Sequence, residues 1–298
     1  MVRVFTVILT ILTFGSVLPP SPTATADQAR LRVVATFSIV GDLVKNIGGG
    51  AIALETLVGT DGDAHTYEPL PRDARVLLVA EVIFESGFGF EPWLDRVYRS
   101  SRSTAPRIQV GQGVAPRRNE LGEPDPHFWH DVSASIIAAQ TIRDALVGID
   151  PLNAEGYTAR ADAYIHRLEA LDVWVFEQVA SLPVDRRTMV TSHDTFEYFA
   201  ARYDLRILGF VLPFSTEGQP SAREVAGLVQ DIRAARVPAV FTENVSDPRL
   251  LQRIAREAGV ALAQPLYTDA LGPVNSPAST YIDLVRYNVQ TIVSALSR

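Results

Sequence analysis

Short apolar runs alternate with segments that carry apolar residues on one face along the first half of the chain. The runs rich in Val, Ile and Leu predict strands, and the one-faced segments predict helices. The predicted strands are residues 31–37, 51–58, 82–84 and 107–110, and the predicted helices are residues 39–47, 71–79 and 91–98. Because this alternation is typical of parallel sheets covered by helices, we expect an α/β fold.

Residues 153–182 form one long amphipathic segment instead. Apolar side chains recur there at spacings of three and four, which predicts a single helix with one buried face. They are Tyr157, Ala161, Tyr164, Leu168, Leu171, Val175 and Val179. A helix of this length spans roughly 45 Å, longer than most helices within a domain. We therefore expect a rigid strut between two halves of the protein.

The alternation of strands and helices returns in the second half of the chain. The predicted strands are residues 188–191, 205–210, 239–242 and 260–263, and the predicted helices are residues 194–203, a segment capped by Ser221, 248–257 and 280–296. The whole pattern predicts an N-terminal α/β lobe (27–150), a linker helix (151–182) and a C-terminal α/β lobe (183–298). We expect parallel sheets covered by helices in both lobes and a cleft between them.

Residues 1–26 have the features of a secretory signal peptide. Arg3 precedes an apolar run at residues 4–18, and the small residues Ala24-Thr25-Ala26 end the segment. The apolar run is shorter than the about 20 residues that a membrane-spanning helix needs. No cysteine follows it for lipid attachment. We therefore expect a soluble periplasmic protein without a lipid anchor.

The composition restricts the chemistry of any site. The chain has no cysteine, five histidines and a formal net charge of −7. An acidic chain is unlike a nucleic-acid-binding protein, so no nucleic-acid partner is expected. Without thiolates, a transition-metal site has to use imidazole nitrogen and carboxylate oxygen.

Three histidines and one aspartate fall in loops or at strand ends. His65 and His193 each follow a predicted strand, His127 precedes a helix, and Asp269 lies in a late loop. Ligands of open α/β sheets bind outside the carboxyl ends of the strands, so the cleft between the halves is a natural meeting point. Three imidazoles and one carboxylate would form a tetrahedral site, although a single loop histidine is more often a surface residue. We expect His166, inside the long helix, to be solvated or partly packed.

Several short motifs follow one another in a characteristic order. They are DAHTYEP (63–69), ESGFGFEPWL (85–94), DPHFW (125–129), TSHDTFEYF (191–199), STE (215–217), YTD (267–269) and RYN (286–288). Together they resemble the solute-binding proteins of zinc and manganese ABC importers, the cluster A-I family. The resemblance covers nearly the whole chain after residue 26. It implies two α/β lobes joined by one rigid helix, with a single metal held between them.

By position, the resemblance implies that His65 and His127 are metal ligands from the first lobe, and His193 and Asp269 from the second. Manganese-binding members often have glutamate at the position of His193, whereas histidine is similar to the zinc-binding members. A third imidazole also makes a site softer, which suits zinc. The expected substrate is therefore Zn²⁺, with Mn²⁺ (or iron) as the alternative.

The implied function is transport, not catalysis. We expect a periplasmic protein that captures the metal with high affinity and delivers it to the membrane permease of an ABC importer. A monomer is expected, and a periplasmic metal donor is a further candidate partner. Asp194 and Glu243 are candidates to orient the ligand imidazoles through hydrogen bonds.

Two features depart from the family pattern. Many zinc-binding members have a long histidine-rich loop between the first two ligands, whereas the segment of residues 111–126 is short here and contains no histidine. Loop-assisted metal capture is therefore in doubt. His130 stands where the family usually has an aliphatic residue. An accessory ligand and a metal-transfer residue are both open, but we expect a simple surface substitution.

Two other classes of function stay open at this point, a secreted zinc hydrolase and an adhesin that binds metal incidentally. A catalytic zinc needs an open position for water and a general base nearby. Four protein ligands would leave no open position, and the sequence has no His-Glu-x-x-His motif. An adhesin of the same fold would be distinguished by the absence of a transport defect on deletion.

Overall fold

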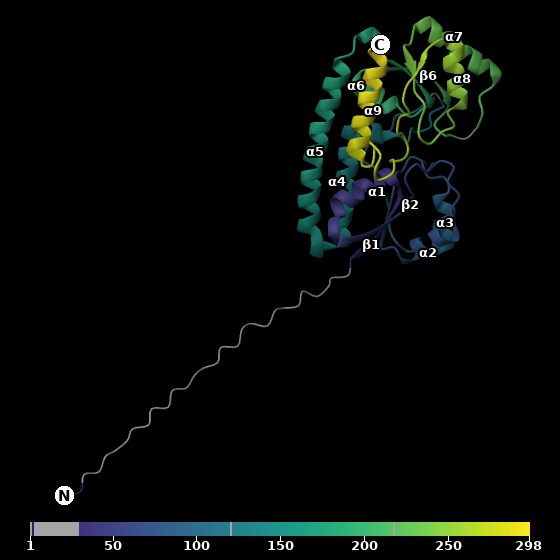
Figure 1. Cartoon of the computed structure of the whole chain (residues 1–298). Coiled ribbons are helices and arrows are strands. Elements are labelled where there is room, and N and C mark those ends of the chain that lie inside the picture. The colour runs from purple at the N-terminus through teal and green to yellow at the C-terminus, as the bar shows by residue number, and fades with distance from the viewer. Residues whose placement is uncertain (1, 3–29, 120, 217) are drawn as a thin grey trace.

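The computed structural model shows two lobes arranged end to end beside a set of long helices (Figure 1). It describes residue 2 and residues 30–119, 121–216 and 218–298. The predicted signal peptide, residues 1–26, lies outside the described residues except for residue 2, so it stays a prediction.

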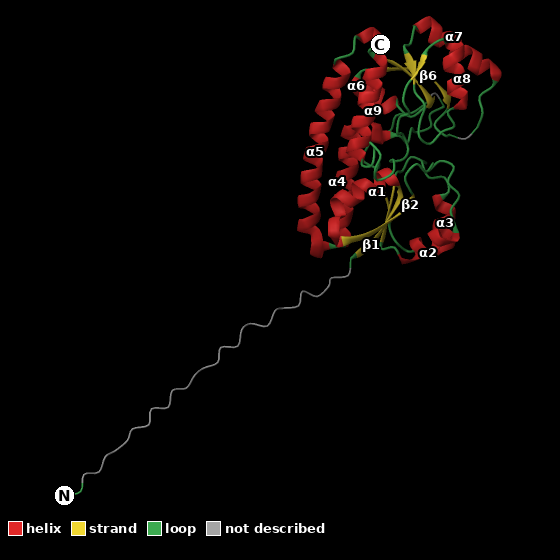
Figure 2. Ribbon diagram, in the orientation of Figure 1, coloured by secondary structure: helices red, strands yellow, loops and turns green. Residues whose placement is uncertain are grey.

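The N-terminal lobe is built on a parallel four-stranded sheet with the strand order β2-β1-β3-β4. The strands are β1 (Leu31–Phe37), β2 (Ile52–Val58), β3 (Val82–Glu85) and β4 (Arg107–Gln109), and the helices are α1 (Ser38–Gly48), α2 (Pro71–Val79) and α3 (Leu94–Ser101). Every residue of β3 is buried, as expected for a central strand covered on both faces. The predicted α/β fold is confirmed (Figure 2).

The C-terminal lobe contains two pairs of parallel strands. Its strands are β5 (Thr188–His193), β6 (Arg206–Leu212), β7 (Ala239–Val240) and β8 (Ala261–Leu262), and its helices are α6 (Glu197–Tyr203), α7 (Ala222–Ala235) and α8 (Arg249–Ala258). β5 pairs with β6 and β7 pairs with β8. A parallel bridge between Thr191 and Phe241 joins the two pairs. Ser221 forms the predicted capping box with Glu224 at the start of α7.

The predicted long helix is α5 (Ala154–Ala180), and it runs beside both lobes in Figure 1. All seven apolar residues predicted for its inner face are buried. It contacts α1 and α4 (Val132–Ile149), which precede it in the chain, and α9 (Tyr281–Leu296), which follows it. Its 27 residues span about 40 Å. The helix is confirmed, whereas the division of the chain at residues 150 and 182 stays a prediction.

One apolar core continues from the N-terminal sheet through these long helices. It includes Phe37, Trp129, Leu168 and Tyr281, and a smaller cluster lies under α7 and α8. Of the helices that the structure describes, α4 alone is long and apolar enough to cross a membrane by length and composition. Since α4 packs against α1 and α5, its apolar residues contribute to this core.

The end of β5 differs from the prediction in a way that shapes the site. Residues 194–203 were expected to be helical, but α6 begins only at Glu197. The backbone N–H of Asp194 donates to the carbonyl of Leu212, which extends the pairing with β6 by one residue. β5 therefore runs on to His193 and places this side chain at the carboxyl end of the strand.

Candidate metal centre

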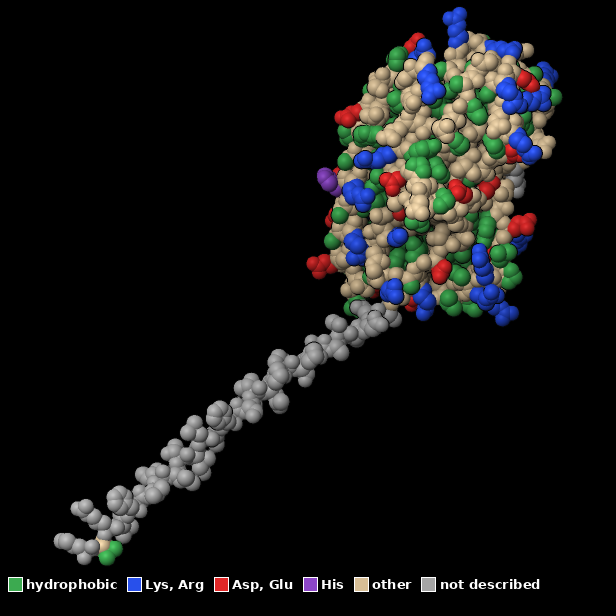
Figure 3. Space-filling model, viewed as in Figure 1, with side chains coloured by type: hydrophobic (Ala, Val, Ile, Leu, Met, Phe, Trp, Pro, Cys, Tyr) green, Lys and Arg blue, Asp and Glu red, His purple; other side chains and the backbone are tan. Residues whose placement is uncertain are grey.

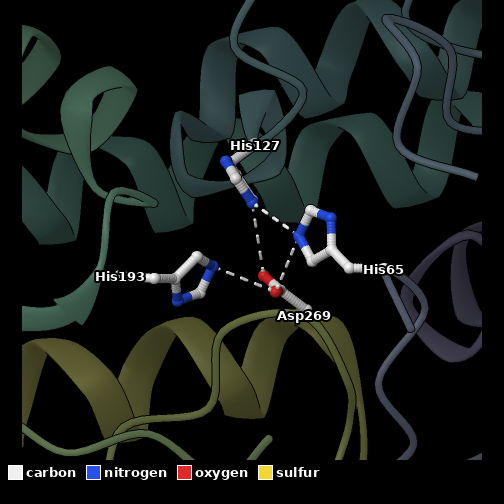
Figure 4. A group of neighbouring side chains, drawn as sticks. All are labelled: His65, His127, His193 and Asp269. Carbon is white, nitrogen blue, oxygen red and sulfur yellow. Dashed lines mark hydrogen bonds and ion pairs between the residues drawn. The ribbon is translucent and has the colours of Figure 1, made fainter. Parts of the chain in front are cut away.

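Four side chains from distant parts of the chain converge between the two lobes. His65, His127, His193 and Asp269 each offer one ligand atom, and these atoms all lie within 4.8 Å of one another. Figure 4 shows the three imidazoles and the carboxylate pointing toward one point. We call these four residues the metal cluster. The structure thus brings together all four residues that the sequence had indicated.

The spacing within the metal cluster fits a small cation. The Nε2 atoms of His65 and His127 are 3.2 Å apart. Asp269 Oδ2 lies 3.3 Å from His65 Nε2 and 3.1 Å from His193 Nε2, and Asp269 Oδ1 lies 3.8 Å from His127 Nε2. A tetrahedral ion with bonds of 2.0–2.1 Å would set its ligand atoms about 3.3 Å apart.

The ligand atoms of the metal cluster are deeply buried, and some of them have no hydrogen bond. His127, His193 and Asp269 are fully buried, and His65 is 8% exposed. His193 Nε2 and both oxygens of Asp269 are buried without a hydrogen bond. A buried carboxylate is costly unless it is paired or coordinates a metal, so this arrangement fits a bound divalent cation.

His65 is held by the loop that follows β2. A turn at residues 59–62 ends the strand, with Asp61 at a positive φ of 54°. Asp63 Oδ1 then accepts a hydrogen bond from the backbone N–H of His65 at 2.9 Å. The other oxygen of this carboxylate, Oδ2, accepts from Thr216 Oγ1 in the opposite lobe. One carboxylate therefore positions His65 and also joins the two lobes.

His127 is oriented by its near neighbour Asp125. Asp125 Oδ1 accepts from both the backbone N–H of His127 at 2.9 Å and its ring Nδ1 at 2.8 Å. With Nδ1 carrying the proton, the lone pair of Nε2 points into the metal cluster. This role of Asp125 was not predicted from the sequence, although the Asp-Pro-His spacing is visible there.

His193 is oriented by Glu243, one of the two residues expected for this task. Glu243 Oε2 accepts from the ring Nδ1 of His193 in a short hydrogen bond. Glu243 Oε1 accepts from the backbone N–H groups of Ser192 at 2.8 Å and His193 at 3.0 Å. In contrast, no hydrogen bond within the described residues links the Asp194 carboxylate to a ligand imidazole, and its Oδ1 has no partner.

Asp269 lies in a loop that Asn244 holds at both sides. Asn244 Oδ1 accepts from the backbone N–H of Thr268 at 3.2 Å, and Asn244 Nδ2 donates to the carbonyl of Ala270 at 3.3 Å. The same Nδ2 donates to Asp61 Oδ1 at 3.0 Å. Asn244 thus connects the Asp269 loop with the loop that carries His65. Sequence reasoning missed this residue because its partners are distant in the chain.

The electrostatics of the metal cluster favour a charge in its centre. Burial holds the pKa of His127 well below its usual range. Burial also opposes a charge on His193, but the carboxylates of Glu243 and Asp269 outweigh it and raise the pKa of His193 well above 6.5. Against its own burial, Asp269 keeps a pKa well below 3.8 because His193 and His127 face it. Without metal, a proton on His193 therefore balances Asp269.

The expectation that His130 is a surface residue was wrong. His130 is 3% exposed and stacks on Phe196 with ring centroids 4.5 Å apart. Burial lowers its pKa to about 3, and its Nε2 has no hydrogen-bond partner. It is not part of the metal cluster. His166 is solvated, as expected, and its side chain is 87% exposed beside Glu169.

The surface carries charged side chains of both signs (Figure 3). Figure 3 shows acidic and basic side chains interspersed over the face that is drawn. The absence of a nucleic-acid partner, expected from the net charge of −7, stays a prediction.

Comparison with known proteins gives a family. The family model for the periplasmic zinc-uptake complex component A, ZnuA, matches residues 33–295, almost all of the described chain. The chain belongs to this family. The ZnuA family consists of solute-binding proteins of metal ABC importers, which are not enzymes. The protein is therefore an extracytoplasmic metal-binding component, and its importer implies a permease partner.

The names of individual relatives mention different metals. The chain is 35% identical to the manganese-binding lipoprotein MntA of Halalkalibacterium halodurans, over 91% of this chain and 90% of the relative. It is 30% identical to the iron-binding protein YfeA of Yersinia pestis, over 98% of this chain and 96% of the relative. Among solved structures, the periplasmic zinc binding protein TroA from Treponema pallidum matches with a TM-score of 0.86 and 29% identity, over 91% of this chain and all of TroA.

Proposed function

We propose that His65, His127, His193 and Asp269 bind one divalent transition-metal ion, which the protein carries to its permease. The observation that supports this most strongly is the convergence of four buried ligand atoms, two of which, those of His193 and Asp269, have no hydrogen bond. Asp125 and Glu243 fix the tautomers of His127 and His193, so that Nε2 is free to coordinate. A cation would also replace the proton that balances Asp269.

Manganese is the cargo that the relatives' names favour, with iron next to it. This support comes from sequence identity to the manganese-binding MntA and the iron-binding YfeA. Zinc is the second candidate, and two observations favour it. Three imidazoles form a soft donor set, and the TroA structure that superimposes well is described as zinc binding.

The order of affinities alone does not decide between these metals. Sites built from nitrogen and oxygen bind Zn²⁺ more tightly than Mn²⁺ as a rule, and cells select by geometry and metal availability. We therefore expect the purified protein to bind Zn²⁺ more tightly than Mn²⁺, even where manganese is the ion that is imported.

The test has two parts. Competitive titration of the full-length protein against a chelating indicator should give one tight site per chain for both metals, and His193→Ala should lose it. Cells that lack the gene should then be analysed for metal content. A fall in manganese supports manganese transport, a fall in zinc supports zinc transport, and unchanged contents with a defect in attachment would favour the adhesin.

The finer expectations on location and assembly remain part of this proposal. The relatives include lipoproteins, whereas this chain has no cysteine, so we propose a periplasmic protein released by signal-peptide cleavage. We also propose that it acts as a monomer. Fractionation of cells and light scattering of the purified protein measure these two properties directly.

A further inference from the structure

A second cavity lies directly beside the metal cluster. It has a volume of about 420 Å³, and three carboxyl-bearing residues line it, namely Asp125, Asp194 and Glu197. We call this cavity the acidic vestibule. Asp125 is the residue that orients His127, and Asp194 follows His193 in the chain. Phe214, which also lines it, has its ring centroid 6.2 Å from that of His127. The vestibule therefore adjoins two of the four ligands.

Two carboxylate oxygens in the vestibule have no partner. Asp125 Oδ2 and Asp194 Oδ1 are both buried without a hydrogen bond, and their residues are only 1% and 7% exposed. Water or protein normally satisfies such groups, because an unpaired buried carboxylate is strongly disfavoured. Two of them in one cavity point to an occupant with positive charge.

The positive side chains of the vestibule lie at its rim. Arg117 has a side chain that is 41% exposed and pairs loosely with Glu197, at 3.7 Å. Arg118 donates to the carbonyl of Gly122. Within the described residues, no ion pair joins either arginine to Asp125 or Asp194. The buried carboxyl groups of Asp125 and Asp194 therefore have no arginine partner among the described residues, and the exposed outer edge of the vestibule carries charges of both signs.

We propose that the acidic vestibule is a second, weak cation site that holds a hydrated divalent metal ion in transit between solvent and the metal cluster. This inference rests on the proposed function of the metal cluster. Among the described residues, only the metal cluster brings three or more ligand atoms close enough for a bare ion. An ion in the vestibule thus keeps its water shell, and carboxylates bind it through those waters.

A transit site has a distinctive kinetic effect. Negative charge at a site entrance raises the local concentration of cations and speeds their association. Because the same vestibule also receives the departing ion, it speeds dissociation by the same factor. Removing its charge therefore lowers both rate constants and leaves the dissociation constant of the metal cluster unchanged.

Binding can be tested with Mn²⁺ alone as the probe. The full-length protein is first loaded with one Zn²⁺ per chain, and Mn²⁺ is then titrated while electron paramagnetic resonance measures free Mn²⁺. A zinc-sensitive dye in the same sample reports any displaced Zn²⁺. We expect one additional Mn²⁺ per chain with roughly millimolar affinity, weakened at least threefold in Asp194→Asn and in Glu197→Gln. Arg117→Gln should tighten it, and Glu177→Gln on the exposed face of α5 should leave it unchanged.

Kinetics provide the second measurement. Stopped-flow tryptophan fluorescence should show metal association and dissociation at the metal cluster slowed at least threefold in Glu197→Gln, with the dissociation constant within twofold of wild type. The proposal is overturned if zinc-loaded wild-type protein takes up no further Mn²⁺, or if both carboxylate variants keep wild-type binding and rates. If the metal cluster itself does not bind metal, the competitive titration with the chelating indicator would show this separately, because the tight site would be absent. Glu197 is half-exposed, so its variant tests the proposal even if Asp194→Asn fails to fold.

Discussion

Replacing Glu243 by glutamine should reverse the tautomer of His193. In the native protein Glu243 Oε1 accepts two backbone N–H groups and Oε2 accepts the Nδ1 proton of His193. Glutamine has one oxygen, which the two backbone donors require. Its NH₂ group then faces Nδ1 and can only donate. His193 must therefore place its proton on Nε2, the atom that faces the metal cluster.

The expected loss of metal affinity follows from the loss of the lone pair on His193 Nε2. Partners that orient a metal-bound histidine typically contribute 10- to 100-fold to metal affinity, which corresponds to about 1.4–2.7 kcal/mol. Glu243 is 3% exposed and water cannot easily replace it, so we expect the upper half of this range. The side-chain volume is nearly unchanged, and the two backbone hydrogen bonds survive. Stability without metal should therefore change much less than affinity.

Competitive titration with a chelating indicator measures the affinity, and circular dichroism checks the fold. Glu177→Gln, the same substitution at an exposed position of α5, is the matched control and should bind metal as wild type does. His193→Ala gives the effect of losing the ligand completely. If Glu243→Gln binds metal within twofold of wild type, then the tautomer argument is wrong.

Four further predictions concern the same region. His193→Ala should lower metal affinity far more than His130→Ala in the same titration, and equal losses would mean that the metal cluster is incomplete. His193→Glu should shift the preference from Zn²⁺ toward Mn²⁺ at least tenfold, because it replaces a soft donor by a hard one. Since the pKa of His193 is raised and a metal ligand must be neutral, binding should release protons, and affinity should fall as pH falls; calorimetry in buffers of different ionisation enthalpy counts them. Burial lowers the pKa of His130 from about 6.5 in the unfolded chain to about 3 in the folded protein. The folded state therefore binds fewer protons than the unfolded state. Below about pH 6.5 the metal-free protein should lose stability by up to about 1.4 kcal/mol per pH unit. Urea unfolding at pH 7 and pH 5 should show a smaller loss for His130→Leu.

The elements that sequence predicted well are those with a strong period. The buried face of α5 was predicted residue by residue, because a helix exposed to solvent on one side leaves a clear spacing of three and four. The end of β5 was less clear, since the pairing of Asp194 with Leu212 depends on a strand that comes later in the chain. Local patterns do not contain that information.

The residues of the site were also only partly predictable from the sequence. The four ligand residues could be named because their motifs resemble a known family, and the structure brings them together. Asn244 could not, since its three partners, Asp61, Thr268 and Ala270, lie on two other loops. His130 was misplaced for a similar reason. Its ring packs against Phe196, a residue of the other lobe that no local pattern connects with it.

Charge explains why a metal would hold the two lobes together. Asp269 and Glu243 are both buried around the metal cluster, and without metal His193, whose pKa they raise, carries a single positive charge against them. A divalent ion brings twice that charge and also ligates atoms from both lobes. The direct hydrogen bonds between the two lobes, such as those of Asp63 with Thr216 and of Asp61 with Asn244, are individually modest at about 1 kcal/mol each. Separating the ligands of the two lobes breaks these bonds whether or not the ion is bound, but with the ion present it must also strip the ion of half its ligands. We expect the Asp269 loop to move first when the ion is released, because its movement would remove one ligand and, through Asn244, also loosen the His65 loop.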